Sequence, residues 1–94
     1  MDSILQQRKE CFICHAKQRL HYHHIYFGTA LRPISEKNGF TCWLCYEHHL
    51  GDFGVHGKHG RETDLFLKRQ CQKKFEKNKS REEFVKLIGR NYLE

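Results

Sequence analysis

The spacing of cysteine and histidine in two short segments constrains the fold more than any other feature of the chain. Cys11 and Cys14 are separated by two residues, and so are Cys45 and His48. Two intervening residues let one turn of backbone direct both side chains at the same ion, and structural zinc usually has four such ligands. The spacing therefore predicts a structural zinc site made of Cys11, Cys14, Cys45 and His48.

A second ligand set stays open because Cys42 lies close to Cys45 in the sequence. In the strand expected there, Cys42 and Cys45 face different sides, which favours His48 as the fourth ligand. A Cys-x-x-Cys pair is the commoner zinc signature, so replacement of His48 by Cys42 remains an alternative. Cys71 lies among apolar residues at helical spacing, which predicts a buried apolar side chain and not a ligand.

A chain of 94 residues is expected to form one domain, 1–94, whose small core needs a metal staple. We expect a metal-containing core at about 11–78 and a C-terminal helix at about 81–89. The five cysteines are an odd number, and no export signal is visible, so reduced thiols in a cytoplasmic protein are expected. No apolar run approaches the length that spans a bilayer, which predicts no membrane partner.

Two strands and a connecting loop are expected before the second cysteine cluster. The aromatic and β-branched run Arg19–Phe27 predicts one strand, and Phe40–Leu44 predicts another. Pro33 and the Asn38-Gly39 pair are typical of loops and turns, so the strands should form a wide antiparallel hairpin.

Helices are expected after an irregular segment at 51–60, which contains four glycines. Apolar residues at four-residue intervals predict a helix from about Asp64 to Asn78. Ser80 and Glu83 have the spacing of a capping box, and Gly89 suits the end of that last helix. The pattern as a whole predicts an α+β fold with an antiparallel hairpin and helices.

Several histidines are left over after the zinc site is assigned. His48 and His49 are adjacent and point in different directions, so His49 is free to bind another metal ion. His23 and His24 project to opposite sides of a strand, so one can bind metal while its neighbour handles a water molecule. We expect three others, His15, His21 and His59, to have ordinary structural roles.

These residues resemble the zinc-containing branch of the HNH, or ββα-metal, endonucleases. The resemblance rests on His23-His24-Ile25 and on Leu44-Cys45-x-x-His48-His49. Three further segments look like small HNH proteins of phages and prophages, namely Ile25-Tyr26-Phe27-Gly28-x-x-x-Arg32, Ser35-Glu36-Lys37 and Gly54-Val55-His56. The resemblance covers roughly residues 11–92 and is a motif hypothesis that needs structural context.

The resemblance implies a role for each residue that matches the family motif. His23 matches a metal ligand and His24 the general base, while His49 and His56 match the remaining metal ligands. The family's asparagine, which orients the base, is matched most nearly by Asn38, although the spacing to the second cysteine cluster is longer here. The implied catalytic residues are therefore His24, His23 and Asn38, and the implied catalytic metal lies on His23, His49 and His56.

The implied chemistry is phosphodiester hydrolysis. This reaction needs a base that activates water and a cation that stabilises charge on the phosphate and the leaving oxygen. Imidazole is a competent base near neutral pH, and imidazole-rich sites accept Mg, Mn, Ni or Zn. We expect a metal-dependent endonuclease or nickase that acts on DNA, with a structural zinc and a second, catalytic divalent metal.

The charge distribution also suits a nucleic acid. The formal charge is +6, and residues 58–94 hold eleven Lys and Arg against six Asp and Glu. The predicted nucleic-acid contacts are Lys58, Arg61, Lys68 and Lys73. No sequence-reading element is recognisable, so we expect either weak sequence preference or targeting by a phage protein partner. A phage-borne protein would act in the cytoplasm of a bacterial host.

Two other functions remain open. The chain could be a non-catalytic zinc-containing module that binds DNA or protein in a phage complex, because a nuclease-like fold does not by itself imply cutting. It could also be a structural component of a phage replication or packaging complex. Loss of DNA cutting in a histidine variant that still folds separates the nuclease from both.

Overall fold

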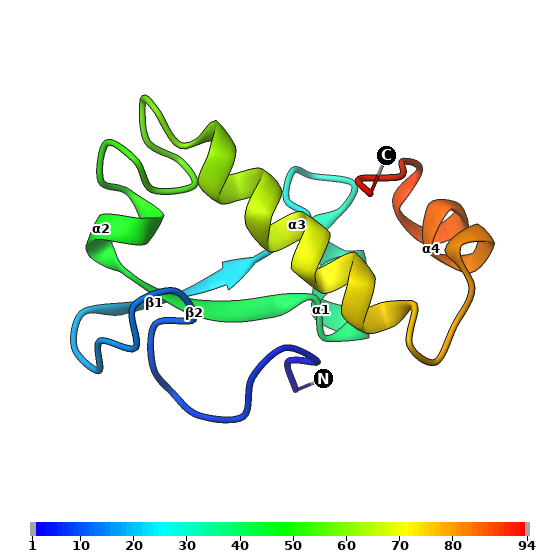
Figure 1. The fold of residues 1–94 in the computed structure, drawn as a ribbon, viewed down its shortest axis with the longest axis horizontal. Helices are drawn as coiled ribbons and strands as arrows, with labels where there is room; N and C mark the ends of the chain where they lie inside the picture. The colour runs from blue at the N-terminus through cyan, green and yellow to red at the C-terminus, as the bar shows by residue number, and fades with distance from the viewer. Residues whose placement is uncertain (1, 94) are drawn as a thin grey trace.

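The fold is built on a two-stranded sheet with helices around it (Figure 1). The computed structural model describes residues 2–93, so the end residues of the predicted 1–94 domain lie outside the described residues. The elements are β1 (Leu20–His24), α1 (Arg32–Asn38), β2 (Thr41–Cys45), α2 (Tyr46–His49), α3 (Arg61–Phe75) and α4 (Arg81–Ile88). The strands pair antiparallel, with Leu20 opposite Cys45 and His23 opposite Cys42. The predicted α+β class and antiparallel hairpin are confirmed.

The connection between the strands contains a helix where the sequence predicted only a loop. Pro33 lies in the first turn of α1, and Gly39 caps its end with a φ of 74°. Proline at the start and glycine just past the end are helix signals, which the turn-like Asn-Gly pair obscured. Ser35 fixes α1 to the end of β1, because its hydroxyl donates to the Tyr26 carbonyl at 2.7 Å and accepts from the Tyr26 N–H at 3.1 Å.

The two C-terminal helices follow the sequence pattern closely. Helix α3 begins and ends three residues earlier than predicted, at Arg61 and Phe75. The capping box at the start of α4 is confirmed, since the Glu83 N–H donates to the Ser80 hydroxyl at 3.0 Å and the Ser80 N–H donates to the Glu83 carboxylate at 3.3 Å. Gly89 caps the end of α4 in the left-handed region. No helix within residues 2–93 is long and apolar enough to cross a bilayer.

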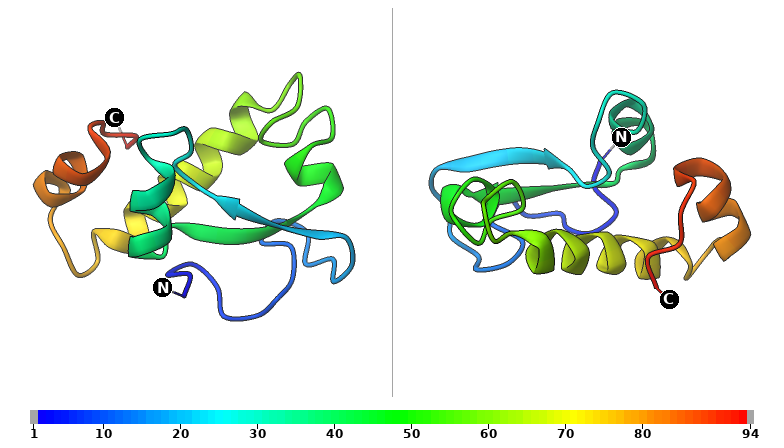
Figure 2. Two further views of the ribbon diagram at one scale, coloured as in Figure 1. Left: turned by 180° about the vertical axis from the view of Figure 1, so that it is seen from behind. Right: turned by 90° about the horizontal axis from the view of Figure 1, so that it is seen from above.

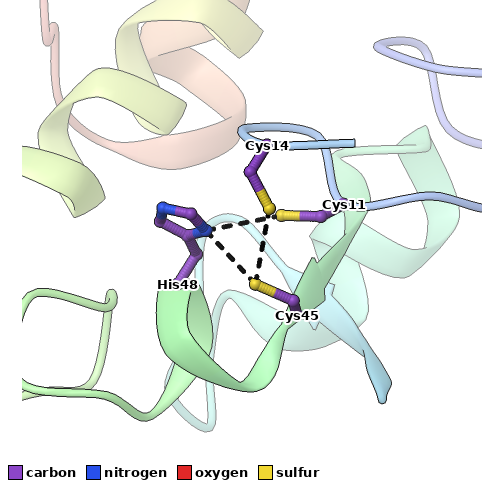
Figure 3. A group of neighbouring side chains, drawn as sticks. All are labelled: Cys11, Cys14, Cys45 and His48. Atoms are coloured by element: carbon purple, nitrogen blue, oxygen red, sulfur yellow. Dashed lines mark hydrogen bonds between the residues drawn. The ribbon is translucent and has the colours of Figure 1, made fainter. Parts of the chain in front are cut away.

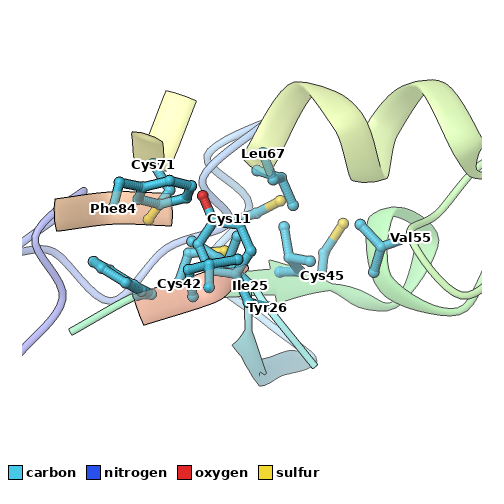
Figure 4. Packing of buried hydrophobic residues seen from close by; sticks show 12 residues of the cluster. Cys11, Ile25, Tyr26, Cys42, Cys45, Val55, Leu67, Cys71 and Phe84 are labelled. Carbon is cyan, nitrogen blue, oxygen red and sulfur yellow. The ribbon is translucent and has the colours of Figure 1, made fainter. Parts of the chain in front are cut away.

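The core lies between the sheet and α3, which runs along one side of it (Figure 2). Ile25, Tyr26, Leu67 and Phe84 are completely buried there (Figure 4). Cys71 is also completely buried among them, as predicted for an apolar residue of α3. The same cluster extends to the end of the hairpin where β2 passes into α2, because Cys11, Cys45 and Val55 also belong to it.

Candidate metal centres

Cys11, Cys14, Cys45 and His48 come together at the end of β2 (Figure 3). The sulfurs of Cys14 and Cys45 are 3.7 Å apart, and the Nδ1 atom of His48 lies 3.2 Å from the Cys45 sulfur and 3.7 Å from the Cys11 sulfur. With zinc bonds of about 2.3 Å to sulfur and about 2.0 Å to nitrogen, tetrahedral ligands are about 3.5–3.8 Å apart. The four residues therefore form a group that fits a structural zinc ion, as the spacing predicted.

The charge state of Cys11 supports this ligand set, and the position of Cys42 in the core excludes the alternative. Burial raises the pKa of Cys11, but backbone N–H groups of Cys14, Cys45 and Ile13 outweigh burial and lower that pKa to about 6. The resulting thiolate is the form that binds zinc. Cys42 is 1% exposed, lies outside the group, and has a pKa raised by burial. Because Cys42 lies in the core and outside the group, it does not replace His48.

His23, His49 and His56 form a second group, in which one ring nitrogen from each lies within 4.8 Å of the others. Burial lowers the pKa of His23 to about 3 and that of His49 to about 4, with further lowering by neighbouring histidines. These two imidazoles are therefore neutral at neutral pH, which is the form that binds metal. The Nε2 atom of His23 is buried and has no hydrogen-bond partner within residues 2–93.

Backbone hydrogen bonds place the three histidines together. The glycine-rich segment after α2 folds back on that helix, and the N–H groups of Val55 and His56 donate to the carbonyls of His48 and His49 at 2.9 Å each. Gly54 lies so close to α2 that an added Cβ would be 2.7 Å from the backbone of His48. The glycines thus permit a close approach, which brings His56 to the other two histidines.

His24 lies beside this group and contacts a carboxylate. Its Nε2 atom is 2.7 Å from Oε1 of Glu36, which belongs to α1. This hydrogen bond is the main cause that holds the pKa of Glu36 below its ordinary value of 4.5. His23, His24, His49 and His56 all line one groove of about 520 Å³. The groove thus joins a cluster of potential metal ligands to a histidine held by a carboxylate.

Comparison with family models, curated proteins and solved structures gave no match. The geometry shows a small α+β protein with two groups of side chains that could each bind metal. One group consists of three cysteines and a histidine, and the other consists of three histidines.

The Glu36 and His21 contacts were missed by sequence reasoning. Glu36 could have been found from the proline and glycine that bracket α1, because a helix there carries it back towards β1. His21, expected to be ordinary, has its Nδ1 atom 2.8 Å from Nδ1 of His49. The even spacing of His21 and His23 along β1, which puts both on one face, was the available signal.

Of the other predicted site residues, Asn38 lies apart from the histidine groove, whereas Lys68 lies beside Phe27, which lines it. The amide of Asn38 donates to the Ile34 carbonyl within α1 at 2.9 Å, and the groove beside His24 is not lined by Asn38. Lys68 is held by Asp64 at 2.9 Å and lies 4.3 Å from the centre of the Phe27 ring. The other predicted nucleic-acid contacts are exposed, namely Lys58, Arg61 and Lys73.

Proposed function

We propose that this protein is a metal-dependent endonuclease or nickase of the HNH, ββα-metal type, which hydrolyses phosphodiester bonds of DNA. The observation that carries the proposal is the buried, unpartnered Nε2 atom of His23 within the His23, His49 and His56 group. A buried nitrogen without a partner costs about 1–3 kcal/mol, and a metal ion is a partner that also explains the other two imidazoles.

In this proposal His24 acts as the general base. It lies next to His23 in β1 and lines the same groove, so it can receive a proton from a water molecule aligned on a bound phosphate. Glu36 fixes the orientation of the imidazole through its hydrogen bond to Nε2, and its carboxylate favours the imidazolium that forms when the proton is taken. Glu36 thus has the positioning role that the resemblance assigns to Asn38.

His23, His49 and His56 would hold the divalent metal. When bound, the ion supplies positive charge that stabilises the scissile phosphate and the leaving oxygen. His21 contacts His49 from outside the group and, through that hydrogen bond, fixes the ring orientation of His49. The separate zinc group fixes the position of α2, which provides His49.

The test is a cleavage assay with supercoiled plasmid and with circular single-stranded DNA, each with added Mg, Mn, Ni or Zn. The parent should cut with at least one metal. His24→Ala should slow cutting about 10²- to 10⁴-fold, the usual contribution of a general base, and His49→Ala should abolish metal-dependent cutting. His59→Ala is the matched control, because His59 is exposed and belongs to neither metal group. Circular dichroism and zinc content should be unchanged in the two catalytic-site variants.

Two results would contradict the proposal. One is a parent protein that cuts neither DNA with any of the four metals, and the other is equal cutting by His24→Ala and the parent. If DNA is still bound in the first case, the non-catalytic zinc-containing binding module becomes the better description.

A further inference from the structure

Tyr22 lies where two surface grooves meet. One groove is the histidine groove of about 520 Å³, and the other, of about 500 Å³, is lined by Trp43 and by residues of the N-terminal segment. The Tyr22 ring lines both grooves, and its side chain is 41% exposed. An exposed aromatic ring therefore connects the second groove to His24.

The rings at this junction meet edge to face. The centre of the Tyr22 ring is 5.2 Å from that of Trp43 and 5.3 Å from that of His24, with interplanar angles of 63° and 87°. Such contacts hold the tyrosine without stacking another ring flat upon it. Because Tyr22 is 41% exposed, its ring offers surface to a planar ligand beside His24, the proposed general base.

Cations lie on both sides of the aromatic rings. The Nζ atom of Lys9 is 4.7 Å from the centre of the Trp43 ring, and Arg8 lines the Trp43 groove. Arg32 lines the histidine groove, where its charge also acts on Glu36. Two carboxylates face the same surface, Asp2 in the Trp43 groove and Glu36 at His24. The surface thus carries three cations and two carboxylates, and one of the carboxylates is hydrogen-bonded to His24. The excess of positive charge suits an anionic chain.

We propose that Arg8, Lys9, Tyr22, Trp43 and Arg32 form an aromatic platform that binds single-stranded nucleic acid and leads the strand to His24. The nucleic-acid nature of the ligand rests on the proposed function. Stacking on tyrosine requires the face of a base, whereas bases in a duplex are stacked on one another and expose only their edges in the grooves. The exposed ring of Tyr22 and the half-buried ring of Trp43, with cations in both grooves, provide stacking surface for bases and positive charge for phosphates, so the substrate is an unpaired stretch.

The experiment measures binding separately from cutting. A fluorescein-labelled 12-nucleotide single strand and the corresponding duplex are titrated with the zinc-loaded full chain, without a second metal, and fluorescence anisotropy is recorded. We expect the single strand to bind at least about 10-fold more tightly than the duplex. Tyr22→Ala should weaken single-strand binding about 5- to 100-fold, the effect of one lost base stack, and Tyr22→Phe should restore it. Trp43, the one tryptophan of the chain, should change its fluorescence when the single strand binds.

Phe53 and Lys73 lie outside the platform and serve as matched controls for Tyr22 and Arg32. Phe53→Ala removes an aromatic side chain that is 70% exposed and should leave the affinity unchanged. Arg32→Gln should reduce the slope of log affinity against log salt by about one phosphate contact, and Lys73→Gln should not.

Equal affinity for duplex and single strand, or unchanged binding by Tyr22→Ala, would overturn the platform. A platform that fails while His24-dependent cutting persists leaves the endonuclease intact. Tyr22-dependent binding without cutting supports the platform and rejects the endonuclease.

Discussion

His48 and His49 are consecutive residues of α2 whose side chains belong to different ligand groups. His48 contacts the Cys45 sulfur at 3.2 Å, whereas His49 lies with His23 and His56. One short helix therefore connects both groups. Because α2 is only four residues long, its position depends on the ligands that hold it.

Loss of zinc should consequently disrupt both groups. Cys45→Ser is expected to lose the zinc ion. Because structural zinc contributes folding free energy, the variant should also lose cooperative unfolding, and with it the binding of a second metal. Metal content and thermal unfolding measure these effects. Cys42→Ala is the control: it removes a buried sulfur at an ordinary cost of about 0.5–3 kcal/mol and should keep one zinc per chain. A Cys45→Ser protein that retains its zinc would contradict the assigned ligand set.

Loss of His23 from the histidine group should not, in turn, disrupt the zinc group. His23→Leu removes a ligand of the second group together with the unpartnered buried nitrogen, so the zinc-loaded variant should be at least as stable as the parent when no second metal is present. Added Ni or Mn should raise the melting temperature of the parent and not of the variant. Calorimetric titration measures the lost binding. Equal metal affinity in the two proteins would remove His23 from the proposed ligands.

The pH dependence of Glu36 reports directly on its contact with His24. The pKa of Glu36 lies below 4.5 chiefly because His24 hydrogen-bonds the carboxylate, so any stabilisation from the ionised group is present above pH 4.5 and is lost as the pH falls through the lowered pKa. In His24→Ala the pKa of Glu36 should rise towards 4.5. Carbon-detected NMR titration of the carboxyl group measures the shift, and His15→Ala should leave it unchanged. An unshifted midpoint in His24→Ala would show that another group lowers the pKa.

Cleavage rates should separate Glu36 from Asn38 as the residue that orients the base. Glu36→Gln keeps the size of the side chain but removes the charge at His24, and should slow cutting at least about 10-fold. Asn38→Ala removes a hydrogen bond within α1 and should change cutting less than Glu36→Gln does, with any loss appearing as lower stability. A larger rate loss in Asn38→Ala, at unchanged stability, would favour the role that the resemblance implies.

The local features of the fold could be predicted from the sequence. Spacing by two residues selects Cys11 with Cys14 and pairs Cys45 with either His48 or Cys42. The capping box at Ser80 depends on atoms within one helical turn. Alternation along β1 likewise put His23 and His24 on different sides. Each of these depends on backbone geometry over a few residues, which the order of amino acids fixes by itself.

Contacts between distant segments were decided only by the tertiary structure. Whether Cys42 or His48 completes the zinc group depended on which of them the core buries, and Cys42 lies against the packed face of the sheet. Glu36 reaches His24 only because α1 forms and is held against β1 by Ser35. Tyr22 joins two grooves because the N-terminal segment, remote in sequence, lies beside β2. Such contacts arise from the packing of whole elements, so residue spacing narrowed the zinc ligands to two sets, while packing decided between the sets and determined the surroundings of His24.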